Sequence, residues 1–114
     1  AEINLQSSNG ATALMLAAFY GHDFYGHERV VELLLRRCAE INLQDSKGFT
    51  ALVHAAYQGH ERLVDLLLRH GADVNLQDII GGTALMVAGL FNHPAVVRRL
   101  LRAGADTART VDGK

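Results

Sequence analysis

The sequence is poor in the residues that many small proteins use for covalent or metal stabilisation. It has one cysteine, Cys38, one proline and no tryptophan among 114 residues. A single cysteine excludes an intramolecular disulfide and a zinc site built from cysteines. No apolar run approaches the roughly 18 residues that cross a bilayer. With 11 basic and 12 acidic residues, bulk charge favours neither nucleic acid nor a membrane surface.

Catalytic and metal-binding motifs are lacking as well. No glycine-rich phosphate loop precedes a Lys-Ser or Lys-Thr pair, and no Gly-x-Ser-x-Gly motif occurs. The carboxylates show no pairing pattern. No two of the six histidines lie four residues apart, as metal ligands on one helix would. We therefore predict a protein that is not an enzyme and that has no cofactor and no metal site.

Internal repetition is the strongest positive signal. The phrase Thr-Ala-Leu begins at residues 12, 50 and 83, so the spacings are 38 and 33 residues. Asn-Leu-Gln recurs in step at 4–6, 42–44 and 75–77, and Gly-Ala-Asp recurs at 71–73 and 104–106. Phrases that share one period indicate stacked repeats of one supersecondary unit.

Each unit predicts a turn followed by two helices. A polar turn with glycine comes first, and a threonine then stands where a helix N-cap belongs. In the second unit the first helix is expected over residues 51–58. Leucines and valines between residues 63 and 68 form the apolar face of a second helix, and Gly71 follows as a left-handed cap. Pro94 suits the first position of the third unit's second helix.

These phrases resemble the ankyrin repeat. Residues 45–52 read Asp-x-x-Gly-x-Thr-Ala-Leu, residues 55–60 read Ala-Ala-x-x-Gly-His, and residues 66–75 read Leu-Leu-Leu-x-x-Gly-Ala-Asp-Val-Asn. The resemblance implies an all-α solenoid of stacked helix-turn-helix units with short β-hairpin-like turns. We expect one domain over residues 1–114: the tail of a preceding repeat (1–6), repeats at about 7–44, 45–77 and 78–110, and the start of a further turn (111–114).

The first unit is five residues too long. Phe-Tyr-Gly-His-Asp at 19–23 is followed at once by Phe-Tyr-Gly-His-Glu at 24–28, which indicates a tandem duplication. We expect a bulged loop, or one extra helical turn absorbed near Gly21 and Gly26. The apolar residues that follow should still pack as in the other units; they are Val30, Val31, Leu33, Leu34 and Leu35.

Two single positions also break the repeat. Cys38 occupies the slot of Gly71 and Gly104, where a left-handed backbone disfavours any side chain. Arg99 replaces the leucine found at positions 33 and 66. We interpret Arg99 as a polar substitution on the outer face of a terminal cap, although the partial repeats at both ends favour a fragment of a longer array.

Other polar groups have alternative interpretations. His22 and His60 follow a glycine in the turn between the two helices, and His93 follows Asn92 at the same place. The resemblance to the ankyrin repeat implies a structural hydrogen-bonding role for these histidines. The basic cluster of Arg98, Arg99, Arg102 and Arg109 reads as a solvated capping face, with nucleic acid or an acidic partner as the alternatives.

The resemblance places turn tips and the outer positions of the first helices on a concave surface. These slots hold an excess of aromatic and aliphatic residues, which usually mark interaction sites. The candidate partner-binding residues are Phe19, Tyr20, Lys47, Phe49, Tyr57, Gln58, Ile79, Ile80, Leu90 and Phe91.

The resemblance thus implies a non-catalytic protein–protein interaction module of the cytoplasm or nucleus. Its partner is a protein of unknown identity, with no nucleic acid and no membrane involved. Two alternatives stay open: a regulatory array within a larger enzyme or channel, and a scaffold in which the duplication affects repeat stability. Self-association through open repeat ends and Ile79 and Ile80 is a further possibility.

Overall fold

The computed structural model describes residues 2–20, 26–37 and 39–105, and these residues contain six α-helices and no strand. The helices are α1 (Ala13–Phe19), α2 (Gly26–Arg36), α3 (Ala51–Gln58), α4 (Glu61–Arg69), α5 (Ala84–Leu90) and α6 (Pro94–Arg102). They form three helical pairs: a first unit (α1, α2), a second unit (α3, α4) and a third unit (α5, α6). The prediction of an all-α fold of stacked pairs is confirmed.

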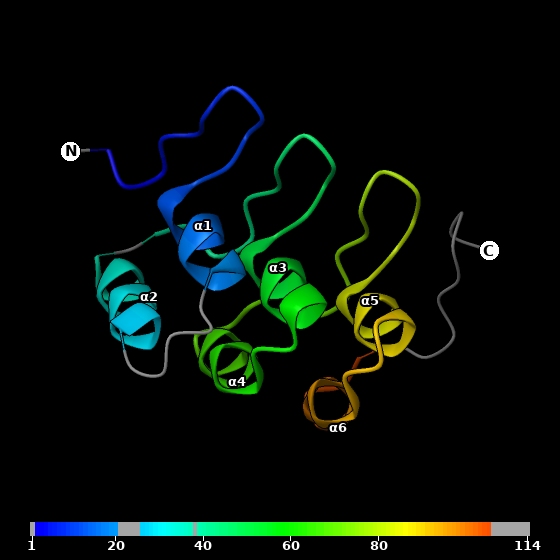
Figure 1. The fold of residues 1–114 in the computed structure, drawn as a ribbon. Helices are drawn as coiled ribbons and strands as arrows, with labels where there is room; N and C mark the ends of the chain where they lie inside the picture. Colours follow the sequence, from blue (N-terminus) through cyan, green and yellow to red (C-terminus); the bar gives the residue numbers. More distant parts are fainter. Residues whose placement is uncertain (1, 21–25, 38, 106–114) are drawn as a thin grey trace.

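The units stack side by side, so that the helices form two layers (Figure 1). Helices α1, α3 and α5 make one layer, and α2, α4 and α6 make the other. A long turn projects from the start of each helix in the first layer. We call the surface made by these turns and by the exposed sides of α1, α3 and α5 the inner surface. The molecule measures 40 × 28 × 21 Å.

Each helix of the first layer begins after a buried threonine. Its hydroxyl oxygen accepts a hydrogen bond from the backbone N–H three residues later, at 3.2, 3.2 and 3.4 Å. The three threonines are only 2 to 3% exposed. Since an N-cap satisfies a donor that the helix leaves unpaired, the predicted caps are confirmed; they are Thr12, Thr50 and Thr83.

The turns are built as the sequence predicts. In the second turn, Asp45 Oδ1 accepts hydrogen bonds from the backbone N–H groups of Lys47 and Phe49, at 2.9 and 3.0 Å. Gly48 has φ +81°, and a Cβ there would lie 2.8 Å from the backbone of Asp78 in the next turn. Glycine is therefore required twice over, by its left-handed backbone and by the close approach of the neighbouring turn.

The predicted start of α6 and the predicted glycine after α4 are also confirmed. Pro94 is the first residue of α6, and Gly71 and Gly104 both have φ +89°. Cys38, which has the equivalent position in the first unit, lies outside the described residues. The same holds for residues 21–25 of the duplicated segment and for residues 111–114, so the expectations about them stay predictions.

The recurring Asn-Leu-Gln segment holds adjacent units together. Asn4 and Asn42 each accept, through Oδ1, a backbone N–H of the following unit's loop, at 2.8 and 2.9 Å. The Gln44 side-chain amide donates to the carbonyl of Gly48 in its own turn and to that of Gln77 in the next segment. The structural role of the recurring Asn-Leu-Gln segment is to make these hydrogen bonds between adjacent units.

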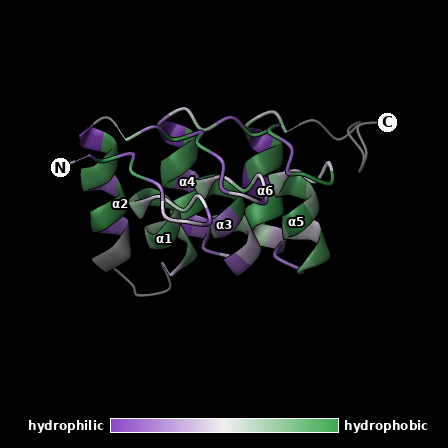
Figure 2. Cartoon of the chain, turned by 90° about the horizontal axis from the view of Figure 1, so that it is seen from above, coloured by the Kyte–Doolittle hydropathy of each residue, from purple (hydrophilic) through white to green (hydrophobic). Residues whose placement is uncertain are grey.

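The core lies between the two layers and runs through all three units. Each second helix contributes side chains to this core that are fully buried, with 0 to 1% exposure; they are Val31, Val64, Val96, Leu67 and Leu100. Hydrophobic and hydrophilic stretches alternate along α2, α4 and α6 in Figure 2, as expected for helices that bury one face.

The first unit packs less completely than we expected. Val30 and Leu33 of α2 are 44% and 49% exposed, whereas the equivalent Leu63 and Leu66 of α4 are 2% and 5% exposed. Leu34 and Leu35 are half-buried against the core. The expectation of equal packing is wrong for Val30 and Leu33, because among the described residues α2 has a neighbour in the second layer, α4, on one side only.

The interpretation of Arg99 as part of an outer cap is also wrong. Its guanidinium lies 2.9 Å from Asp65 and 3.1 Å from Glu61, both on α4. The hydrogen bond to Asp65, together with the charges of both carboxylates, raises the pKa of Arg99. Arg99 therefore faces the preceding unit across an internal junction, and not the end of the stack.

Candidate interaction surface

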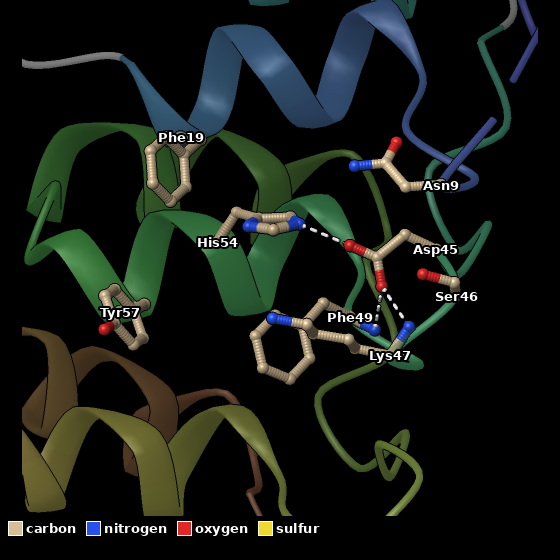
Figure 3. A pocket seen from close by; sticks show the side chains of 8 residues that line it. All are labelled: Asn9, Phe19, Asp45, Ser46, Lys47, Phe49, His54 and Tyr57. Atoms are coloured by element: carbon tan, nitrogen blue, oxygen red, sulfur yellow. Dashed lines mark hydrogen bonds and ion pairs between the residues drawn. The ribbon is translucent and has the colours of Figure 1, made fainter. Parts of the chain in front are cut away.

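A pocket of about 460 Å³ opens on the inner surface between the first and second units. Figure 3 shows its lining, which comes from α1, α3 and the first two turns. The lining residues are Asn9, Phe19, Asp45, Ser46, Lys47, Phe49, His54 and Tyr57.

An aspartate–histidine pair lies in the wall of this pocket. His54 Nε2 is 2.9 Å from Asp45 Oδ2, and the two side chains are only 15% and 12% exposed. The other carboxylate oxygen of Asp45 accepts the two backbone N–H groups of its own turn. This one carboxylate thus ties the second turn to α3 and fixes the position of the imidazole ring.

Aromatic side chains surround the imidazole. The rings of Phe19 and Phe49 approach it edge-on, with centroid distances of 5.6 and 5.4 Å. Tyr57 lies one helical turn along α3 and is 37% exposed. Its ring is 4.3 Å from that of Phe91 in the next unit. The pocket therefore combines apolar walls with a polar pair whose positions are fixed, as ligand-binding pockets commonly do.

The pocket does not have the geometry of a serine hydrolase, although serine, histidine and aspartate all line it. In such enzymes the serine hydroxyl bonds to the imidazole nitrogen that the aspartate leaves free. Here that nitrogen is His54 Nδ1, which is buried and has no hydrogen-bond partner among the described residues. Among these same residues, no group of three His, Cys, Asp or Glu is arranged to hold a metal ion.

The predicted partner-binding residues divide into separate groups. Four of them, Phe19, Lys47, Phe49 and Tyr57, line the pocket, and Phe91 joins it through Tyr57. Tyr20 is 53% exposed and packs its ring edge-on against Phe19. Gln58 is half-buried at the end of α3.

The third turn carries a second exposed group. Ile79 and Ile80 are 72% and 64% exposed. The backbone N–H of Ile79 donates to the carbonyl of Lys47 at 3.1 Å, which sets the third turn directly beside the second. Leu90 is 78% exposed, because no described unit covers it as the second unit covers the equivalent Phe19.

Sequence reasoning did not single out His54 or the carboxylate of Asp45 as parts of a site. The signal was present, since His54 takes a slot that holds Leu16 in the first unit and Val87 in the third. A polar residue in one copy of an otherwise apolar slot marks a place where the units differ.

Two other histidines have the structural role that was predicted. His93 Nε2 lies 2.9 Å from the carbonyl oxygen of Tyr57, and His60 Nε2 lies 3.3 Å from that of Phe19. Each bond links a unit to the end of the preceding first-layer helix. His22 lies outside the described residues, and so does Arg109 of the predicted basic cluster.

Comparison with known proteins identifies the family. A model described as Ankyrin repeats (3 copies) matches residues 1–78 and again residues 24–111. No curated protein matches the chain. Within the described part of the chain, no helix has the length and apolar character needed to span a membrane. Because the family model covers nearly the whole sequence, the chain belongs to the ankyrin repeat family.

Proposed function

We propose that this chain binds a partner protein through its inner surface, with the pocket beside His54 as the anchoring point. Ankyrin repeat domains generally act as protein-interaction modules and are typically not catalytic. One observation carries the proposal: the pocket on the inner surface is lined by Phe49 and His54, whose equivalents in the other units are small or aliphatic residues.

The pocket suits an apolar side chain of the partner. Its volume of about 460 Å³ lies within the range of ordinary ligand sites. Phe19, Phe49 and Tyr57 supply the aromatic contact area that dominates the binding energy of many interfaces. The ammonium group of Lys47 forms no ion pair with any described residue, so it is available for a polar group of the partner at the rim.

The pocket is also preorganised. Asp45 already bonds to His54 and to two backbone N–H groups, so the ring and the turn are ordered before a partner arrives. Ordering side chains on binding costs roughly 0.5–1.5 kcal/mol for each flexible group. A wall that is already fixed avoids much of that cost.

We further propose that the repeats extend over about 7–44, 45–77 and 78–110, and the three helical pairs fall within these bounds. The pocket then lies at a junction between two repeats. This placement supports a site that exists only when both repeats are folded.

The proposal is tested by selecting binders from a random peptide library displayed on phage against the immobilised chain. Affinities of the selected peptides are then measured for the parent and for Tyr57→Ala and Lys47→Ala variants. We expect Tyr57→Ala to weaken binding at least about ten-fold, and Lys47→Ala to weaken it less.

A matched control is Arg69→Ala in α4, where the side chain is 68% exposed and lies in the second layer. Its affinity should equal that of the parent. Circular dichroism verifies that all variants keep their helices. Peptides that bind the two pocket variants as tightly as the parent would contradict the proposal.

A further inference from the structure

The junctions between second-layer helices follow one charge order. At the α2–α4 junction, Glu28 of the earlier helix lies 3.4 Å from Arg62 of the later one. At the α4–α6 junction, Asp65 and Glu61 of the earlier helix lie 2.9 and 3.1 Å from Arg99 of the later one. In both cases the earlier helix supplies carboxylates and the later helix supplies a guanidinium.

Helix α6 breaks this order on the side that is turned away from α4. The positions 33 residues after Glu61 and Asp65 hold Pro94 and Arg98. Arg98 therefore carries a positive charge at the position where α4 carries the carboxylate of Asp65. Arg98 and Arg102 are both exposed, and neither forms an ion pair with any described residue.

Apolar side chains accompany these arginines. Leu101 is 45% exposed, and Val97 is half-buried beside it. Together with Arg98 and Arg102 they form a patch that we call the α6 outer face. Such a mixed face matches a helical partner, because apolar contact supplies binding energy while the charges select the partner.

We propose that the α6 outer face binds a partner protein through a helix that carries acidic and apolar side chains. The proposed contact reverses the charge order of the internal junctions, because the partner supplies the carboxylates and this chain supplies the guanidinium groups. The site is separate from the pocket beside His54, and it does not depend on the function proposed for that pocket.

A second copy of this chain does not fit the α6 outer face. In the first unit, Arg29 has the position that Arg62 has in the second. If the first unit of another copy stacked on α6 as the internal units stack, Arg29 would meet Pro94 in place of a glutamate, and Arg98 would meet Leu33 in place of an arginine. Neither of the internal ion pairs would form, which selects against a continuous head-to-tail array of identical chains.

Nucleic acid is a poorer match than an acidic protein helix. Binding to a duplex usually rests on several Lys or Arg contacts to phosphates. The α6 outer face offers two arginines with a leucine between them, and the whole chain has a net charge of −1.

The test is an NMR titration of the 15N-labelled chain with two synthetic helical peptides of 14 residues. Both carry leucine and alanine at the same positions; one has glutamate and the other lysine on the leucine face. We expect the glutamate peptide to shift the amide signals of Val97, Arg98, Leu101 and Arg102, and the lysine peptide to leave them in place.

Two variants locate the binding. Arg98→Glu should weaken the glutamate peptide at least about five-fold, since the change replaces attraction with repulsion. Arg36→Glu is the matched control on α2, with a side chain that is 68% exposed, and should bind as the parent does. Tyr57→Ala should also bind this peptide unchanged, which separates the result from that of the pocket.

Three outcomes would overturn the proposal. The first is equal shifts with both peptides. The second is tighter binding of a 12-base-pair DNA duplex than of the glutamate peptide, with loss of the duplex in Arg98→Glu. The third is concentration-dependent association of the parent in sedimentation that disappears in Arg98→Glu, which would make a second copy the occupant.

Discussion

The inner surface has two junctions between neighbouring turns, and the two are built alike. We call the junction of the first and second units, which holds the pocket, the first groove, and that of the second and third units the second groove. In each, the later turn donates one backbone hydrogen bond to the earlier turn. The Ser46 N–H donates to the Asn9 carbonyl at 2.9 Å, and the Ile79 N–H donates to the Lys47 carbonyl at 3.1 Å. Asp45 and Asp78 each accept, through Oδ1, hydrogen bonds from the backbone N–H groups two and four residues later in their own turns.

The side chains that fill the two grooves are different. Lys47, Phe49 and His54 of the first groove correspond to Ile80, Gly82 and Val87 of the second. The first groove therefore holds an aspartate–histidine pair and an aromatic pocket, whereas the second presents exposed isoleucines. Residues that recur between units build the fold, and Lys47, Phe49 and His54, which do not recur, join the recurring Asp45 in the pocket.

One detail couples the differing positions. A Cβ at Gly82 would lie 2.8 Å from Asp78 Oδ2. In the second turn the equivalent oxygen of Asp45 bonds to His54, and a phenylalanine occupies the glycine's position. The turn that bears the phenylalanine is thus also the one whose carboxylate bonds to a histidine.

The largest expected effect comes from a residue that serves the shared fold. Leu67 has 0% exposure in α4, the second helix of the middle unit. Leu67→Ala should lower the free energy of unfolding by about 2–5 kcal/mol, since it removes buried apolar surface and leaves a cavity. Urea denaturation monitored by circular dichroism measures the change. A loss below about 1 kcal/mol would show that the middle unit does not carry the shared core.

A smaller effect should distinguish the two grooves. Asp45→Ala removes the acceptor for two backbone N–H groups and for His54, so we expect a loss of about 1–3 kcal/mol of stability. Asp78→Ala is the matched control, because it removes the two backbone bonds alone. The same urea denaturation compares the two variants. Equal losses would show that the His54–Asp45 pair contributes nothing to stability.

A stabilising change is expected where the first unit departs from the other two. Gly71 and Gly104 have φ +89° and open space around the place of a Cβ. If position 38 shares that backbone, Cys38→Gly should raise the free energy of unfolding by about 1 kcal/mol by removing the strain of a left-handed side chain. Thermal denaturation in the presence of a reducing agent provides the measurement. An unchanged midpoint would mean that the first unit ends its second helix differently.

The smallest effect should follow from moving the polar pair to the second groove. Val87→His places an imidazole near Asp78 Oδ2, which accepts no hydrogen bond from any described residue. One new hydrogen bond should offset the lost apolar contact to within about 0.5 kcal/mol. The 15N shifts of the labelled imidazole report whether its nitrogen bonds to a carboxylate. Imidazole signals like those of free histidine would show that the pair needs the aromatic neighbours of the first groove.

Local signals made most of the fold predictable. The threonine caps, the helix over residues 51–58 and the glycine after α4 depend on contacts within a few residues, and each lies where the sequence places it. The repeated phrases then imply the stacking, because one unit alone leaves an apolar face uncovered. The ten predicted partner-binding residues follow from the family pattern in the same way, and four of them line one pocket.

Contacts between units were harder to predict. Arg99 breaks an apolar pattern, but its meaning depends on the carboxylates of Glu61 and Asp65, which come from the neighbouring helix. Likewise, His54 and Asp45 are nine residues apart, and their pairing depends on how the turn folds over α3. A repeat comparison shows where units differ, whereas the pairing of side chains becomes visible only in three dimensions.

The claim that non-recurring side chains form the binding site is tested most directly by replacing one groove's residues with those of the other. In a triple variant, Lys47→Ile, Phe49→Gly and His54→Val give the first groove the residues of the second. Isothermal titration with a peptide selected on the parent should give affinity at least about ten-fold weaker, with the helical circular dichroism retained. Undiminished affinity in this folded variant would contradict the account.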